Sequence, residues 1–204
     1  MRLFRPCFFS GWLYPEAFFR IKTTEKVLSL TFDDGPDPVS TPELIGILKN
    51  YDVKAIFFCN GRAAEKHPDL IDLIKLNGHL IGNHGYNHLN GWRTSVTKYV
   101  ADTEYGSRFT SSDLFRPPYG RLKPGQYRKL KRTYKIFFWD IMHYDFDKSM
   151  GAAKSFDVLL LKIRPGSVIV LHDQPFSTLI PLLPRFIETT ILRGYRFVLP
   201  DSFI

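Results

Sequence analysis

Two adjacent carboxylates at the end of an apolar, β-branched run offer the most distinctive chemistry in the sequence. Residues 31–38 read TFDDGPDP, so Asp33 and Asp34 are followed at once by turn-forming residues. Like charges this close repel, and a buried pair must take up a proton, a cationic partner or a metal ion. An acidic turn between a strand and a helix would explain the same residues. Histidine and arginine side chains at the ends of other strands would favour the chemical interpretation.

Two histidines supply candidate metal ligands. His84 and His88 are four residues apart, so one helical turn would direct both imidazoles at one ion. The pair alone is a weak signal, because loop histidines are more often surface or hydrogen-bonded residues. Asp33 or Asp34 could supply an acidic third ligand. An Asp/His/His set leaves a position open for water or substrate, as at a catalytic zinc.

Three later segments add further candidates. Arg116 precedes the proline- and glycine-rich turn 117–120, where an arginine could hold a carboxylate and a fixed backbone N–H could face developing negative charge. A rigid turn without chemistry is the simpler interpretation. Segment 139–147 combines acids and aromatic residues. His172 follows an apolar run and is a candidate general acid, since imidazole titrates near neutral pH, although a lone histidine there is more often structural.

Short β-rich runs alternate with longer polar–apolar segments from Lys26 onward, a pattern typical of repeated β-α units. We expect strands at 27–32, 54–59, 79–82, 114–116, 134–141, 167–171 and 195–199. We expect helices from Ser40 and at 63–76, 96–109, 125–132, 152–163 and 178–192. The predicted fold class is α/β, an irregular (β/α) barrel of about seven parallel strands. Such barrels place chemistry after the strands, which is where the candidates fall.

Length and composition favour one domain. The chain has 204 residues, of which 44% are hydrophobic, enough for a single core spanning 1–204. We expect the aromatic segment 1–25 to pack against that domain, with an interfacial membrane anchor as the alternative. Cys7 and Cys59 fit neither a disulfide framework nor a cysteine-rich zinc site, so we expect free thiols in a reducing compartment.

Charge and hydropathy indicate location and partners. Prolines and charges interrupt any apolar run before residue 20, and no run approaches the roughly 20 apolar residues of a spanning helix, so we expect a cytoplasmic protein without a cleaved signal. The net charge of +8 favours anionic surroundings. No nucleic-acid motif is recognised, and we expect no nucleic-acid partner. The basic segment 116–135 is either a solvated face or a contact for phosphate or an anionic membrane.

Five motifs occurring in order resemble those of the polysaccharide deacetylase family, carbohydrate esterase family 4, over roughly residues 26–200. Residues 31–36, TFDDGP, match the first motif in full. The resemblance implies that Asp33 is the catalytic base. It also implies that Asp34, His84 and His88 bind a divalent metal, with Zn²⁺ expected first and Co²⁺ or Ni²⁺ as alternatives.

The resemblance also implies roles for the later candidates. Arg116 would tether the base, and the backbone amide of Tyr119 would serve the oxyanion. Asp145 would orient His172, which would act as the general acid. Phe146 stands where a tryptophan usually walls the acetyl methyl group, and Trp139 is a further candidate on the substrate side. Gly85 and Leu89 depart from the usual Ser or Thr and Pro, so we expect the loop around His84 to lack one stabilising side-chain hydrogen bond.

The activity implied is hydrolysis of an N-acyl group, usually N-acetyl, from an amino-sugar glycan or sugar conjugate. A phosphate- or lipid-linked sugar and peripheral contact with an anionic membrane are compatible with the positive charge. The alternative is a weakly active or inactive carbohydrate-binding protein on the same scaffold.

Overall fold

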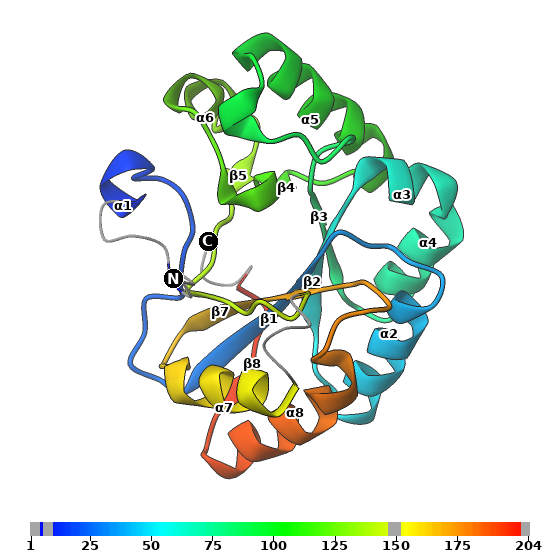
Figure 1. Ribbon diagram of the computed structural model, residues 1–204, viewed down its shortest axis with the longest axis vertical. Helices are drawn as coiled ribbons and strands as arrows, with labels where there is room; N and C mark the ends of the chain where they lie inside the picture. Colours follow the sequence, from blue (N-terminus) through cyan, green and yellow to red (C-terminus); the bar gives the residue numbers. More distant parts are fainter. Residues whose placement is uncertain (1–4, 6–9, 147–151, 201–204) are drawn as a thin grey trace.

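A parallel β-sheet occupies the centre of the computed structural model, which describes residues 5, 10–146 and 152–200 (Figure 1). The strands are β1 (Val27–Asp33), β2 (Ala55–Cys59), β3 (Leu80–Asn83), β4 (Leu114–Phe115), β5 (Lys135–Ile136), β6 (Ile141–Met142), β7 (Ser167–His172) and β8 (Arg196–Phe197). Seven follow the order β5-β4-β3-β2-β1-β7-β6, and β8 pairs with the start of β1. All the pairings between these strands are parallel. The sheet curls into a half-barrel, which confirms the predicted α/β class.

Helices surround the outside of this sheet (Figure 1). They are α1 (Ser10–Leu13), α2 (Ser40–Asn50), α3 (Gly61–Lys66), α4 (Pro68–Leu76), α5 (Val96–Thr110), α6 (Pro124–Leu130), α7 (Ala152–Lys162) and α8 (Leu183–Leu192). Three 3-10 turns complete the described elements: η1 (Gly91–Arg93), η2 (Pro118–Gly120) and η4 (Ile180–Leu182). The segment predicted as one helix at 63–76 forms two helices, and Pro68 begins the second. The break lies at His67, because the residue before a proline disfavours helical backbone geometry.

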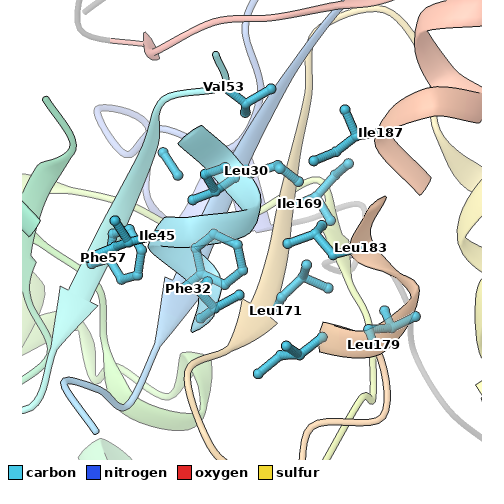
Figure 2. Packing of buried hydrophobic residues seen from close by; sticks show 14 of the residues in the cluster. Leu30, Phe32, Ile45, Val53, Phe57, Ile169, Leu171, Leu179, Leu183 and Ile187 are labelled. Carbon is cyan, nitrogen blue, oxygen red and sulfur yellow. The ribbon is translucent and has the colours of Figure 1, made fainter. Parts of the chain in front are cut away.

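Side chains along β1 alternate between the hydrophobic core and the face that carries the candidate site residues. Leu30 and Phe32 point to the outer face, where they pack in one apolar cluster with residues of β7 and α8 (Figure 2). Thr31 and Asp33 therefore point to the other face, because successive strand residues alternate. Both are buried, and both bond the same arginine, as described below. The outer face anchors the strand and the inner face carries polar groups.

The region predicted as one strand at 134–141 is two short strands at opposite ends of the sheet order. Between them, Phe137 forms a bridge with Phe18, and the N–H of Phe138 donates to the carbonyl of Phe18 at 2.8 Å. The N–H of Asp140 then donates to the carbonyl of Val168 at 3.0 Å. The prediction of a single strand was wrong because the chain leaves one sheet edge here and joins the other.

The described part of the N-terminal segment lies along this crossing. The rings of Tyr14 and Phe19 stack on Phe138 at centroid distances of 5.1 and 4.9 Å. Arg20 forms an antiparallel bridge with Ser167 at the start of β7. Of the two cysteines, Cys59 is a buried free thiol, and Cys7 lies outside the described residues. Among the described residues, no helix is long and apolar enough to cross a membrane.

The outer core gives a direct test of the packing. Leu183 and Leu192 lie at the two ends of α8, with exposed fractions of 1% and 88%. Leu183→Ala should lower the free energy of unfolding by about 2–5 kcal/mol, because it leaves a cavity against β7. Leu192→Ala is the matched control and should change it by about 0.5 kcal/mol or less. Urea denaturation measures both, and equal effects would contradict the packing shown in Figure 2.

Candidate active site and metal centre

Sheet register brings the candidate residues to one edge. Asp33 is the last residue of β1 and pairs in register with His172, the last residue of β7. His84 and Arg116 directly follow β3 and β4, whose residues Asn83 and Phe115 are also paired. Since all these strands are parallel, their carboxyl ends meet on one side of the sheet.

Arg116 is the central polar side chain of the interior. It is fully buried, and its Nη1 donates to Asp33 Oδ1 at 2.6 Å and to Thr31 Oγ1 at 2.7 Å. Its Nη2 donates to the carbonyl of Phe138 at 2.9 Å, and the guanidinium lies 4.0 Å from the ring centroid of Phe58. The guanidinium therefore fixes one oxygen of Asp33 and compensates its buried charge.

Asp34, His84 and His88 converge as a candidate metal-binding set. Their ligand atoms lie within 4.8 Å of one another, with Asp34 Oδ1 at 3.1 Å from His88 Nε2 and 3.7 Å from His84 Nε2. The carbonyl of Arg116 accepts from His84 Nδ1 at 2.8 Å, which leaves the Nε2 lone pair directed at the set. One carboxylate and two imidazoles suit a zinc-like divalent ion. The donor set fits a metal.

The charge states of these groups also suit metal binding. Burial lowers the pKa of His84 to about 4, so the imidazole is neutral at physiological pH. Burial alone would raise the pKa of Asp34, but the hydrogen bond from His88 and the nearby imidazoles of His84 and His172 hold it below its usual range. A neutral imidazole and an ionised carboxylate are the forms that bind metals.

His172 faces this set from the other half of the site. Its Nδ1–H donates to Asp145 Oδ1 at 2.6 Å, and its backbone N–H donates to Asp145 Oδ2 at 2.9 Å. The hydroxyl of Ser177 also donates to Asp145, and the backbone N–H of Thr178 donates to its carbonyl at 2.9 Å. Burial alone would lower the pKa of His172, but the Asp145 carboxylate outweighs it and raises the pKa to about 9. This imidazole is therefore held in place and charged.

A cavity of about 530 Å³ joins the two halves. Its lining includes eight of the predicted residues: Asp33, Asp34, His84, His88, Tyr119, Trp139, Phe146 and His172. Arg116 and Asp145 lie behind it, in contact with Asp33 and His172. The cavity is also lined by Pro117, Gly120 and Arg121 of the basic segment 116–135, by Met142 and Tyr144 of segment 139–147, and by Gln174 and Phe176, which lie outside the predicted segments. A larger cavity of about 700 Å³, against residues 11–22 and 131–136, contains none of the candidate residues.

Comparison with known families identifies the scaffold. The family model described as polysaccharide deacetylase matches residues 20–135, more than half of the chain. The chain belongs to the polysaccharide deacetylase family. The resemblance inferred from the five motifs is confirmed.

Two relatives and one solved structure that resemble this polysaccharide deacetylase chain are all named as peptidoglycan deacetylases. A peptidoglycan-N-acetylglucosamine deacetylase of Bacillus cereus is 30% identical over 193 residues, covering 88% of this chain and 89% of the relative. The peptidoglycan-N-acetylmuramic acid deacetylase PdaA of Bacillus subtilis is 28% identical over 167 residues, covering 77% and 64%. The crystal structure of the Bc1960 peptidoglycan N-acetylglucosamine deacetylase superposes with a TM-score of 0.84 and 33% identity over 95% of both chains.

In this deacetylase, the loop carrying the histidines is held by two side chains that the sequence did not reveal. Asn83 Oδ1 accepts from the N–H of Gly85 at 2.8 Å. Asp102, from α5, accepts from the backbone N–H groups of Tyr86 and Asn87 at 3.0 and 3.2 Å. These bonds hold a loop in which Gly85 lacks the usual hydroxyl side chain. The Asn83 contact is local, whereas no local motif marks Asp102, because it acts from the following helix.

Gln174 was also missed, and it contacts the candidate metal-binding set. Its Nε2 donates to Asp34 Oδ2 at 2.6 Å, which leaves Oδ1 on the side of the two histidines. An amide that fixes the second oxygen of a ligating carboxylate controls how that carboxylate meets the ion. The only sequence signal is its position two residues after His172.

Removing this amide should weaken metal binding. Gln174→Ala should lower Zn²⁺ affinity by about 10- to 100-fold, because Asp34 loses its orienting donor. Competition with a chromophoric chelator measures the affinity. Phe176→Ala is the control, since Phe176 lines the same cavity but is 49% exposed. Equal affinity in Gln174→Ala and the unmodified protein would contradict this role.

Proposed function

We propose that this chain is a metal-dependent hydrolase that removes the N-acetyl group from an amino sugar in a glycan. The proposal is carried by one observation: a single cavity holds the Asp34, His84 and His88 set together with Asp33 and His172. The names of the relatives support an N-acetylated bacterial cell-wall glycan as the substrate class.

The proposed metal is Zn²⁺, with Co²⁺ or Ni²⁺ as alternatives, bound by Asp34, His84 and His88. A bound divalent ion supplies Lewis acidity and lowers the pKa of water towards neutrality. The irregular loop that carries His84 and His88 brings their donor atoms to one point with Asp34, which Gln174 orients.

Asp33 is the proposed general base. Arg116 holds its Oδ1, while its Oδ2 lies 4.0 Å from His84 Nε2, on the side of the metal-binding set. This oxygen can accept the proton of the attacking water. The two neighbouring aspartates thus have different partners, with Asp33 bound to Arg116 and Asp34 facing the histidines.

His172 is the proposed general acid. Asp145 holds its Nδ1 proton, so the other ring nitrogen is the one that can protonate the departing amine. The raised pKa, about 9, keeps this proton in place at neutral pH until the leaving nitrogen needs it. The backbone N–H of Tyr119, beside the ligand His88, is proposed to face the developing oxyanion.

Two aromatic residues are proposed to contact the substrate. The Phe146 ring meets His172 edge to face at a centroid distance of 4.8 Å, where it can pack on the acetyl methyl. The indole of Trp139 is 9% exposed, and its Nε1–H has no acceptor among the described residues. Because Trp139 lines the cavity, its ring is proposed to pack against the substrate.

Two substitutions distinguish the role of the general base from that of the bound metal. Asp33→Asn should lower N-deacetylation by about 100-fold or more, because the general base is lost, while the metal stays bound. His84→Ala should lose both activity and metal. Release of acetate and amine from an N-acetylated oligosaccharide measures activity, and elemental analysis measures metal content.

The outcomes distinguish the alternatives. Full activity in Asp33→Asn would overturn the assignment of the base. A metal-loaded, unmodified protein that binds N-acetylated glycans without releasing acetate would favour the inactive carbohydrate-binding alternative.

Location and surface partners stay predictions. One proposal is peripheral contact of the basic segment 116–135 with an anionic membrane. A cytoplasmic location is proposed only together with a phosphate- or lipid-linked sugar as substrate, since an enzyme inside the cell would act on a biosynthetic intermediate and not on the assembled wall. Flotation with vesicles of anionic or neutral lipid tests the membrane contact. Equal recovery of the protein with both kinds of vesicle would contradict it. Cell fractionation tests the location.

A further inference from the structure

An exposed aromatic platform lies beside the cavity, and its side chains have no part in the proposed reaction. Trp92, in η1, is 61% exposed, and Tyr119 is 54% exposed. The guanidinium carbon of Arg121 lies 5.1 Å from the ring centroid of Trp92 and 5.9 Å from that of Tyr119. Stacking on both rings orients the planar guanidinium at the rim of the cavity.

The platform is built rigidly. A Cβ on Gly91 would lie 2.0 Å from the carbonyl oxygen of Arg121, so the two backbones are in direct contact. The fully buried side chain of Gln126 donates to the carbonyls of Gly91 and Thr94 at 2.9 and 3.2 Å. The N–H of Trp92 donates to the side chain of Asn90 at 3.1 Å. A surface turn held by a buried amide is preorganised for a ligand.

Arg121 carries an uncompensated charge. Among the described residues, no carboxylate forms an ion pair with it. The two acids that line the cavity have other partners, since Asp33 bonds Arg116 and Asp34 faces His88. No Asp or Glu occurs from Leu114 to Trp139. A guanidinium held at a cavity rim without an acid is suited to a carboxylate or phosphate.

Arg121 lies close to the candidate metal site, where the scissile N-acetyl group would bind. The Tyr119 ring meets the ring of His88 edge to face at a centroid distance of 4.4 Å. One aromatic ring therefore separates Arg121 from a candidate metal ligand. An anion bound there would belong to the sugar being deacetylated or to its neighbour in the glycan, with Trp92 available to pack on a sugar face.

We propose that Arg121, with Trp92 and Tyr119, forms an anion subsite that selects glycans carrying a carboxylate or phosphate next to the N-acetylated sugar. This inference rests on the proposed function and specifies its substrate class. The lactyl carboxylate of muramic acid and a phosphate on the glycan share the required chemistry, and paired substrates distinguish them.

The test compares kcat/KM on three N-acetylated oligosaccharides of equal length: one neutral, one with lactyl carboxylates and one phosphorylated. Arg121→Gln should lower kcat/KM on at least one anionic substrate by about 10- to 100-fold and leave the neutral one within about 2-fold. Arg121→Lys should recover part of the loss, since the charge returns without the planar fork. Arg93→Gln is the matched control, because Arg93 lies in the same exposed turn but does not line the cavity.

Three results would overturn the inference: no preference of the unmodified protein for either anionic substrate, equal losses on neutral and anionic substrates in Arg121→Gln, or the same loss in Arg93→Gln. Calorimetric binding of the three oligosaccharides to the Asp33→Asn variant, with and without Arg121→Gln, gives the same comparison without turnover. A protein without deacetylase activity that still binds the anionic glycan through Arg121 would overturn the proposed function and support the subsite.

Discussion

The site depends on one buried charge, the guanidinium of Arg116. A fully buried cation is costly unless it is paired and hydrogen-bonded, and here Asp33, Thr31 and the carbonyl of Phe138 accept from its two terminal nitrogens. Its own carbonyl accepts from His84. These contacts connect β1, the loop after β3, the turn after β4 and the crossing between β5 and β6. The compensation of one charge thus fixes the proposed base and one candidate metal ligand relative to each other.

This arrangement resolves the repulsion between two neighbouring carboxylates. Asp33 ends β1 with its side chain on the inner face, while Asp34 adopts a positive φ of 79° and turns out of the strand. The two side chains consequently meet different partners, the guanidinium of Arg116 for the first and the imidazole pair for the second. Adjacent acids are tolerated because the backbone separates their partners, and this separation makes different chemical roles possible.

Sequence patterns predicted the parts of this protein whose causes are local. The strands at 27–32 and 167–171 are mostly apolar runs, and both occur as expected. The strand at 134–141 was wrong, because the division between β5 and β6 depends on Phe18, far away in the chain. Gln174 has the same kind of cause, since it acts on Asp34 across 140 residues of sequence. Tertiary contacts of single polar side chains leave no periodicity or motif in a sequence.

The register between β1 and β7 fixes the position of Asp33 relative to His172, and so of one half of the site relative to the other. Asp33 and His172 are paired across β1 and β7, and five further pairs from Leu28 to Phe32 hold the same alignment below them. A slip of one residue would move Leu30 and Phe32 off the outer apolar cluster and turn Asp33 towards the helices. The burial of the outer face therefore opposes any shift that would misplace the base relative to the acid. The distance between the proposed base and acid is set by the hydrophobic core on the opposite side of the same two strands.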